Sequence, residues 1–190
     1  MAQAGPPFLN QVRQRHPDQK VQVWFQDEAR VGQQGRLTQV WSTRGSRPVM
    51  VRQTQYKWAY IFGAVNPLTG ASSALISPTV NAVVMSHHLA MISREAGPDV
   101  HVVLVLDNAG WHHARALKVP DGMTLLFLPA YSPELMPMER LWCWMKEHDL
   151  SNRVFEDEAA IDKACAQSWN NLTPERIQSI TKTQWIERAN

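Results

Sequence analysis

The feature that most constrains the fold is an aliphatic run at residues 100–106, VHVVLVL, in which His101 is the one polar residue. A short run this apolar is typical of a strand that is buried on both faces of its sheet. Such strands occur in sheets whose two faces are covered by helices, and their neighbours are mostly parallel. The run ends directly in Asp107, so we expect a carboxylate at the end of a central strand.

The order of the remaining elements predicts the fold class. Further strands are predicted at 21–27, 37–41, 49–51, 58–65, 71–77 and 123–128. Helices are predicted at 11–20, 81–96, 114–119, 137–148, 156–170 and 174–181. Strands that come first, followed by alternating helices and strands, predict an α/β fold with a mixed sheet. We expect an antiparallel meander, then parallel strands, with helices on both sides.

Length and composition fit one domain with a full core. The chain has 190 residues, of which 44% are hydrophobic and 19% charged, as in ordinary globular proteins. We expect an N-terminal segment at 1–20, a core at 21–150, and a C-terminal helical extension of the same domain at 151–190. No apolar run reaches the roughly 18 residues of a membrane helix, and the N-terminus lacks a signal-peptide pattern. We therefore expect a cytoplasmic protein with reduced cysteines.

Basic residues are concentrated in one part of the chain. Residues 29–94 contain no Asp or Glu, but they include Arg30, Arg36, Arg44, Arg47, Arg52, Lys57 and Arg94. A one-sided basic segment is expected where a protein binds a phosphate backbone, although a solvated basic loop fits the charge alone equally well. Trp41 and Trp58 bracket the segment and could stack on exposed bases.

Two acids follow apolar strands, and a third lies on a helix. Asp27 and Asp107 each come directly after a predicted strand, where a single Asp is usually a turn former or a helix cap. On neighbouring strands, roughly 4.8 Å apart, the two carboxylates would repel each other unless a cation lay between them. Their hard oxygens favour Mg²⁺ or Mn²⁺. Glu139, in the first turn of a predicted helix, either points at the sheet or simply favours the helix dipole.

Three segments together resemble the signature blocks of mariner-type bacterial insertion-sequence transposases of the DDE superfamily. They are WFQDEAR at 24–30, LDNAGWH at 106–112, and LPAYSPEL at 128–135 with ERLW at 139–142. The segment GSRP at 45–48 resembles a further block of that family. The resemblance covers about residues 20–150, and the separation of Asp107 from Glu139 is close to the usual one. Met136 stands where the family often has Asn.

The resemblance implies an RNase H-like core with the catalytic triad Asp27, Asp107 and Glu139. In that family the triad binds two divalent metal ions, Mg²⁺ or possibly Mn²⁺. The enzymes cleave transposon ends and join them to target DNA by phosphodiester hydrolysis and transesterification. The neighbouring acids Glu28 and Glu134 are not expected to be ligands.

The resemblance also implies partners. Such transposases act as dimers on paired DNA ends, and we expect a homodimer. The family carries an N-terminal helix-turn-helix region, for which residues 1–20 are too short, so a separate end-recognition protein is a further expected partner. Candidate DNA contacts are Arg30, Arg44, Arg47, Arg52 and His112, although His112 could instead pack under its loop.

Two other functions remain open from the sequence. The chain could be another RNase H-like nuclease, such as a ribonuclease H or a junction resolvase. It could also be an inactive or domesticated fragment that binds DNA without cutting it.

Overall fold

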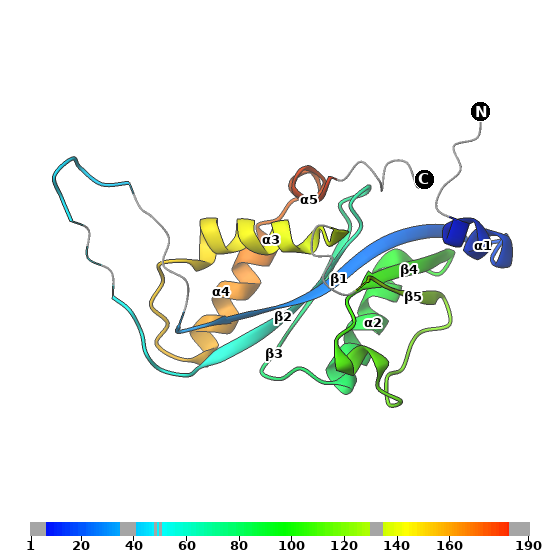
Figure 1. Ribbon diagram of the computed structural model, residues 1–190, viewed down its shortest axis with the longest axis horizontal. Helices are drawn as coiled ribbons and strands as arrows, with labels where there is room; N and C mark the ends of the chain where they lie inside the picture. Colours follow the sequence, from blue (N-terminus) through cyan, green and yellow to red (C-terminus); the bar gives the residue numbers. More distant parts are fainter. Residues whose placement is uncertain (1–6, 35–40, 48, 50, 130–134, 183–190) are drawn as a thin grey trace.

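The computed structural model describes residues 7–34, 41–47, 49, 51–129 and 135–182. In this part of the chain one five-stranded sheet has the strand order β3-β2-β1-β4-β5, and helices cover both of its faces (Figure 1). The strands are β1 (Lys20–Gly32), β2 (Trp58–Val65), β3 (Ser72–Ser77), β4 (Val100–Leu106) and β5 (Met123–Phe127). The helices are α1 (Pro7–Arg15), α2 (Ala82–Ala96), the 3₁₀-helix η1 (Gly110–His113), α3 (Met138–Met145), the π-helix η3 (Lys146–Leu150), α4 (Glu158–Asn170) and α5 (Pro174–Thr181).

The pairing confirms the predicted mixed sheet. β1, β2 and β3 form an antiparallel meander. On the other side of β1, β4 and β5 continue the sheet in parallel. The fold is therefore the α/β arrangement expected from the order of the elements.

β1 is longer than predicted and changes its partners along its length. Its first half, from Lys20 to Phe25, pairs in parallel with β4. Its second half, from Phe25 to Gly32, pairs antiparallel with β2. The prediction that this strand ends at Asp27 was wrong, because β2 continues to supply backbone hydrogen bonds after β4 has ended. Asp27 thus lies within a strand, beside the place where the neighbouring strand stops.

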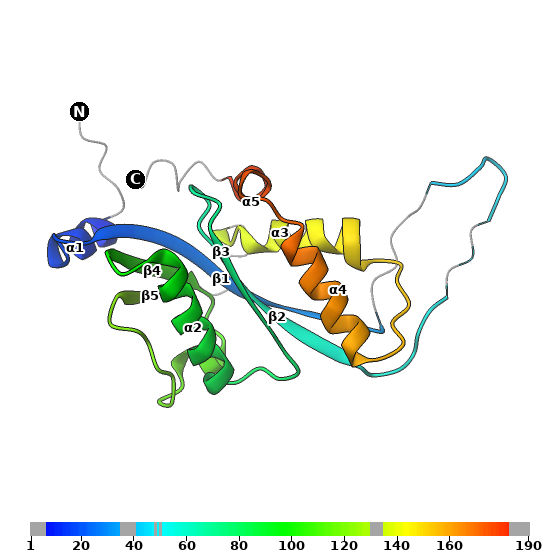
Figure 2. The same cartoon turned by 180° about the vertical axis from the view of Figure 1, so that it is seen from behind.

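Alternate residues of β1 and β4 point into two separate cores. Phe25 and Val105 belong to the core under α3 and α4, whereas Trp24 and Leu104 belong to the core under α2. Figure 2 shows α2 and α4 beside different parts of the sheet. Gln26 and Asp27 continue this alternation, so neighbouring side chains at the end of the parallel pairing face opposite sides.

Two short elements differ from the predictions. The helix expected at 114–119 is absent from the structure, and the four-residue η1 precedes this segment. The described residues between Gln33 and Trp58 contain no strand, so the strand predicted at 49–51 was wrong, and most of that predicted at 37–41 lies outside the described residues. This connection extends away from the sheet (Figure 1). No described helix is both long and apolar enough to cross a bilayer.

Candidate active site

Asp27 lies in β1, and Asp107 directly follows the adjacent parallel strand β4. The last paired residues are Phe25 and Val105, each two positions before one of the acids. Because side chains alternate along a strand, Asp27 points to the same face as Phe25, which is the face that α3 covers. Asp107 lies beyond the end of its strand, where its Oδ1 contacts His112, so the close approach of the two carboxylates stays a prediction.

Asp27 is largely buried and accepts a hydrogen bond from α3. The indole Nε1 of Trp142 donates to Asp27 Oδ2 at 2.9 Å. Burial raises the pKa of Asp27 to about 7, and the charges of Glu28 and Glu139 raise it further, while the Trp142 bond opposes this. No basic side chain in the described part of the chain forms an ion pair with Asp27. Its charge is therefore left uncompensated by the protein.

Trp142 reaches Asp27 because the facing residue on β2 is a glycine. Gly63 is the register partner of Asp27. A Cβ atom added to Gly63 would lie 2.5 Å from Cη2 of Trp142 and 2.8 Å from Cζ3 of Trp169, which is closer than atoms pack. The two tryptophans lie together, with ring centroids 6.0 Å apart. Gly63 thus leaves the space in which the Trp142 ring lies flat on the sheet.

Glu28 faces the opposite side of the sheet from Asp27 and has a cationic partner. Its Oε1 accepts hydrogen bonds from Gln26 Nε2 at 3.0 Å, His112 Nε2 at 3.2 Å and Trp111 Nε1 at 3.3 Å. Burial alone would raise the pKa of Glu28, but the hydrogen bond and charge of His112 outweigh it, so the pKa is lowered. Glu28 is therefore ionised at neutral pH.

His112 lies between two carboxylates. Its Nδ1 is 3.0 Å from Asp107 Oδ1 and 3.1 Å from the Asp107 carbonyl oxygen, while Nε2 faces Glu28. Both nitrogens face acceptor oxygens, an arrangement that favours the doubly protonated, cationic ring. Burial would lower the pKa of His112, but these partners raise it. The residue is 3% exposed, which favours the packing role over the DNA contact, and that contact stays a prediction.

Glu139 lies in the first turn of α3, at the rim of this site. Its side chain is exposed, and its charge is close enough to raise the pKa of Asp27. Among the described residues, however, no group of three or more His, Cys, Asp or Glu side chains is arranged to hold a metal ion. The structure therefore places Glu139 near Asp27, and Asp107 at the end of the adjacent strand, and the three-carboxylate cage stays a prediction.

The chemistry of the two Asp residues fits a divalent cation. Carboxylate oxygens are the ligands that Mg²⁺ and Mn²⁺ prefer. A buried Asp27 with a pKa of about 7 would hold its negative charge most readily with a cation beside it. Asp107 is half exposed, with 55% of its side chain accessible, so a cation bound there would remain open to a substrate.

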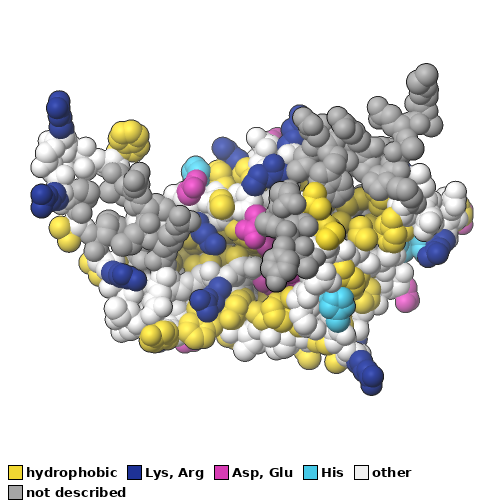
Figure 3. All heavy atoms as spheres, in the orientation of Figure 1, with side chains coloured by type: hydrophobic (Ala, Val, Ile, Leu, Met, Phe, Trp, Pro, Cys, Tyr) yellow, Lys and Arg dark blue, Asp and Glu magenta, His cyan; other side chains and the backbone are white. Residues whose placement is uncertain are grey.

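The predicted DNA-contacting arginines lie at the surface, on and beyond the second half of β1. Arg30 is exposed, and its guanidinium lies 5.6 Å from the centroid of the Trp58 ring. Arg44, Arg47 and Arg52 are exposed on the connection between β1 and β2. On the face seen in Figure 3, Lys and Arg side chains lie along this connection. Arg36 and Glu134 lie outside the described residues.

The sequence did not reveal the residues that hold the acids. Trp142 lies within the helix predicted at 137–148, and nothing in the sequence pattern indicated that its indole N–H donates a hydrogen bond to Asp27. Gly63 lies within a predicted strand, where a glycine signals a close approach of another group. A glycine at this position indicates a close approach, but it does not identify the group that approaches.

Known proteins resemble this chain in sequence. The family model described as "DDE superfamily endonuclease" matches residues 22–162. An "Uncharacterized protein y4pE/y4sA" of Sinorhizobium fredii is 46% identical over 134 residues, which is 70% of this chain and 99% of that protein. The "Insertion element IS630 uncharacterized 39 kDa protein" of Shigella sonnei is 22% identical over 168 residues, covering 86% of this chain and 45% of that protein.

Solved structures share the fold. The Mos1 strand transfer complex matches with a TM-score of 0.65 at 20% identity, over 96% of this chain and 57% of the Mos1 chain. Mos1 mariner paired-end complexes with Mn and with Mg match at a TM-score of 0.64. The chain spans little more than half the length of these proteins. The resemblance to mariner-type transposases is confirmed, and the chain belongs to the DDE superfamily endonuclease family.

Proposed function

We propose that this chain is the catalytic domain of a cut-and-paste DNA transposase that cleaves transposon ends and joins them to target DNA. The observation that carries the proposal is Asp27, buried in β1 without a basic ion-pair partner among the described residues, with Asp107 directly after the adjacent parallel strand β4. A divalent cation held between these acids would be open to a phosphate on the half-exposed Asp107 side.

Each residue of the site has a proposed role. Asp27 and Asp107 hold Mg²⁺ or Mn²⁺, and Glu139 completes the ligands from the rim. When bound, the ions would activate the attacking oxygen and stabilise the leaving oxygen at the scissile phosphate. Trp142 orients the Asp27 carboxylate through the 2.9 Å hydrogen bond, and His112 orients Asp107. Such outer partners fix the geometry of metal ligands.

Positively charged residues would place the DNA. Arg30, Arg44, Arg47 and Arg52 are exposed on one side of the acids, where they would bind backbone phosphates without reading the sequence. Two of the similar structures are a strand transfer complex and a paired-end complex of Mos1. By analogy we propose that two copies of this chain act on paired ends, with a helix-turn-helix protein or segment that recognises them.

The test is cleavage and joining of a DNA duplex that carries the inverted repeats flanking the gene. With Mg²⁺ or Mn²⁺ the wild-type chain should cut the end and transfer its 3′-hydroxyl to target DNA. Asp107→Ala should abolish both steps, whereas Asp121→Ala, an exposed acid in the turn before β5, should retain them. Cleavage by Asp107→Ala at the wild-type rate would contradict the assignment.

The same assay separates the alternatives. Hydrolysis without joining would indicate another RNase H-like nuclease. Binding of DNA with no cleavage in either metal would indicate an inactive fragment. One observation makes the second outcome worth testing: the chain spans 45% of the insertion-element protein and 57% of the Mos1 chain.

A further inference from the structure

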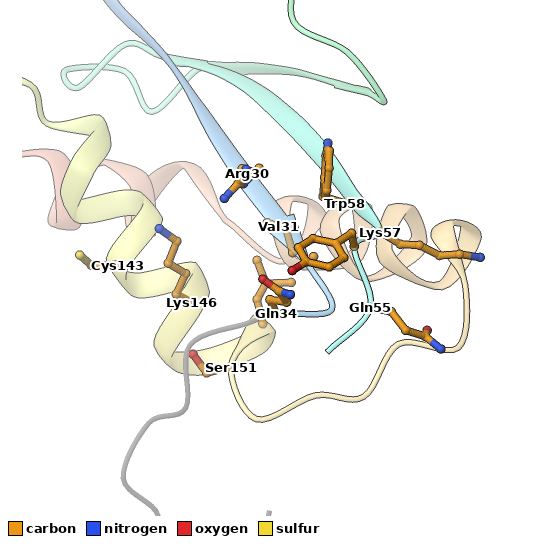
Figure 4. Close-up of a pocket in the computed structure, with 12 residues that line it drawn as sticks. Arg30, Val31, Gln34, Gln55, Lys57, Trp58, Cys143, Lys146 and Ser151 are labelled. Carbon is orange, nitrogen blue, oxygen red and sulfur yellow. The ribbon is translucent and has the colours of Figure 1, made fainter. Parts of the chain in front are cut away.

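A cavity of about 420 Å³ opens at the far end of β1 and β2, away from the acids. It is bounded by Arg30 on β1, Tyr56 and Trp58 at the start of β2, and Lys146 and Ser151 at the end of α3 and η3 (Figure 4). Its volume is within the range of about 300–1,000 Å³ of pockets that bind small molecules. The proposed cleavage chemistry assigns no role to it.

The cavity offers aromatic faces for stacking. The Arg30 guanidinium lies over the Trp58 ring at 5.6 Å, which makes a two-layer platform of a cation on an indole. Trp58 is 39% exposed and Tyr56 is 77% exposed. Large aromatic side chains are seldom left so accessible in a cavity wall. Aromatic rings and guanidinium planes are the groups on which unpaired bases stack.

The charge of the cavity suits a phosphate. Arg30, Lys57 and Lys146 line it, and none of its described lining residues is an Asp or Glu. In Figure 4 the Arg30 side chain points from β1 toward α3, the Lys146 side chain lies along α3, and the Lys57 side chain extends away from α3. Arg30 and Lys146 are therefore the candidates for a phosphate contact. Gln34 and Gln55 add amides, which hydrogen-bond to base edges.

The cavity lies on β1 and α3, which carry Asp27 and Glu139. Arg30 follows Asp27 by three positions on β1, a rise of about 10 Å at roughly 3.4 Å per residue, and its side chain leaves the strand on the opposite face from Asp27. Lys146 follows Glu139 by two helical turns, again about 10 Å at 1.5 Å per residue. A DNA strand bound at the acids would therefore pass around the edge of β1 that β4 does not pair after Phe25, and about three stacked nucleotides, at roughly 3.4 Å each, would span the distance.

We infer that this cavity binds one unpaired nucleotide of the strand that the acids hold. Its base stacks on Tyr56 and on the Arg30–Trp58 platform, and its phosphate contacts Arg30 and Lys146. The inference rests on the proposed action on DNA, but it does not depend on cleavage. It assigns to the cavity the task of holding a single-stranded segment close to the scissile phosphate.

Fluorescence of 2-aminopurine tests the inference in EDTA, where cleavage plays no part. The probe is a DNA duplex with a short single-stranded overhang, labelled at one overhang position at a time. Wild-type protein should quench the fluorescence of 2-aminopurine at one overhang position only, because the base at that position stacks in the cavity. The position of the cavity sets the distance of this base from the end of the duplex. Trp58→Leu and Tyr56→Ala should each relieve this quenching and weaken overhang binding by about tenfold, with little effect on a blunt duplex.

Lys146→Ala should weaken overhang binding and lower the salt dependence of the binding constant by the equivalent of about one phosphate contact. The control is Lys163→Ala, which removes an exposed lysine on α4 and should change neither quantity. Tyr56 lies outside the strands and helices, so its variant answers the question even if Trp58→Leu does not fold. Absence of quenching at every position, or an equal loss of affinity for overhang and blunt DNA, would overturn the inference. A protein that stacks a base here but never cuts would refute only the proposed function.

Discussion

Asp27 and Glu28 are adjacent in β1, and their side chains have different surroundings on the two faces of the sheet. Both carboxyl groups are largely buried, yet burial raises the pKa of Asp27 to about 7, while the pKa of Glu28 is lowered against the same burial. The difference lies in the partners. Asp27 meets a neutral indole N–H from Trp142, whereas Glu28 meets His112, whose pKa is raised by its carboxylate neighbours.

This difference in partners determines which of the two acids is available to bind a metal ion from solution. Glu28 has its cation inside the protein, so it has nothing to gain from a metal ion. Asp27 has none, and the half-exposed Asp107 follows the adjacent strand. A strand that puts neighbouring residues on opposite faces thus separates a structural acid from one suited to bind metal.

The largest effect should be opposite changes in stability from two nearly identical substitutions. Asp27→Asn removes a buried charge that no basic side chain balances. Because the pKa of Asp27 is raised from 3.8 to about 7, the free energy of unfolding should increase by up to about 4 kcal/mol. Glu28→Gln leaves the charge of buried His112 without one of its carboxylates, which should cost about 3 kcal/mol. Urea unfolding at pH 8 in EDTA measures both. Changes in unfolding free energy of the same sign in both variants would show that the two carboxylates do not differ in this way.

The gain from Asp27→Asn should also depend on pH. In the unfolded chain Asp27 loses its proton near pH 4, but in the folded chain it keeps it to about pH 7. Between these values the folded state binds more protons, so wild-type stability falls as pH rises. The free-energy difference between Asp27→Asn and wild type should therefore grow from pH 4 to pH 7 and then level off. A difference that is flat over this range would contradict the raised pKa.

A smaller effect should come from the space that Trp142 occupies. Gly63→Ala places a methyl group 2.5 Å from the Trp142 ring, so it should cost about 1–3 kcal/mol and weaken metal binding. Gly110→Ala is the matched control, because its added Cβ meets no atom within 4 Å. Thermal melting of both variants checks this, and equal melting temperatures would show that the sheet can shift to make room.

The smallest effect should follow removal of a single N–H. Trp142→Phe keeps a ring over Gly63 but cannot hydrogen-bond Asp27, and we expect Mn²⁺ affinity to fall by about tenfold. Trp169→Phe, in the same ring cluster, should leave the affinity unchanged. Isothermal titration calorimetry with Mn²⁺ distinguishes them. If both variants bind equally, the indole does not orient the carboxylate.

The sequence predicted most of the sheet, because its strands are short apolar runs with clear ends. The aliphatic run at β4 indicated a sheet covered on both faces, which the structure has, whereas the proximity of the two acids stays a prediction. It did not predict that β1 continues past Asp27 to Gly32, since that depends on the antiparallel partner β2.

The partners of the acids were also beyond the sequence. Trp142 and Asp27 are 115 positions apart, and His112 and Glu28 are 84 apart. Such contacts depend on the rotation of a helix over a sheet, and a tryptophan in an apolar stripe has the same pattern whether or not its N–H has a partner. The domain bounds at 20 and 150, and the roles of Glu139 and the arginines, stay predictions.

The most direct test is Mn²⁺ titration of wild type, Asp27→Asn, Asp107→Asn and Glu28→Gln at pH 8. We predict that the wild type binds Mn²⁺, that either Asp variant weakens binding by at least about tenfold, and that folded Glu28→Gln retains most of it. Wild-type affinity in both Asp variants, or loss of binding in Glu28→Gln alone, would contradict the account.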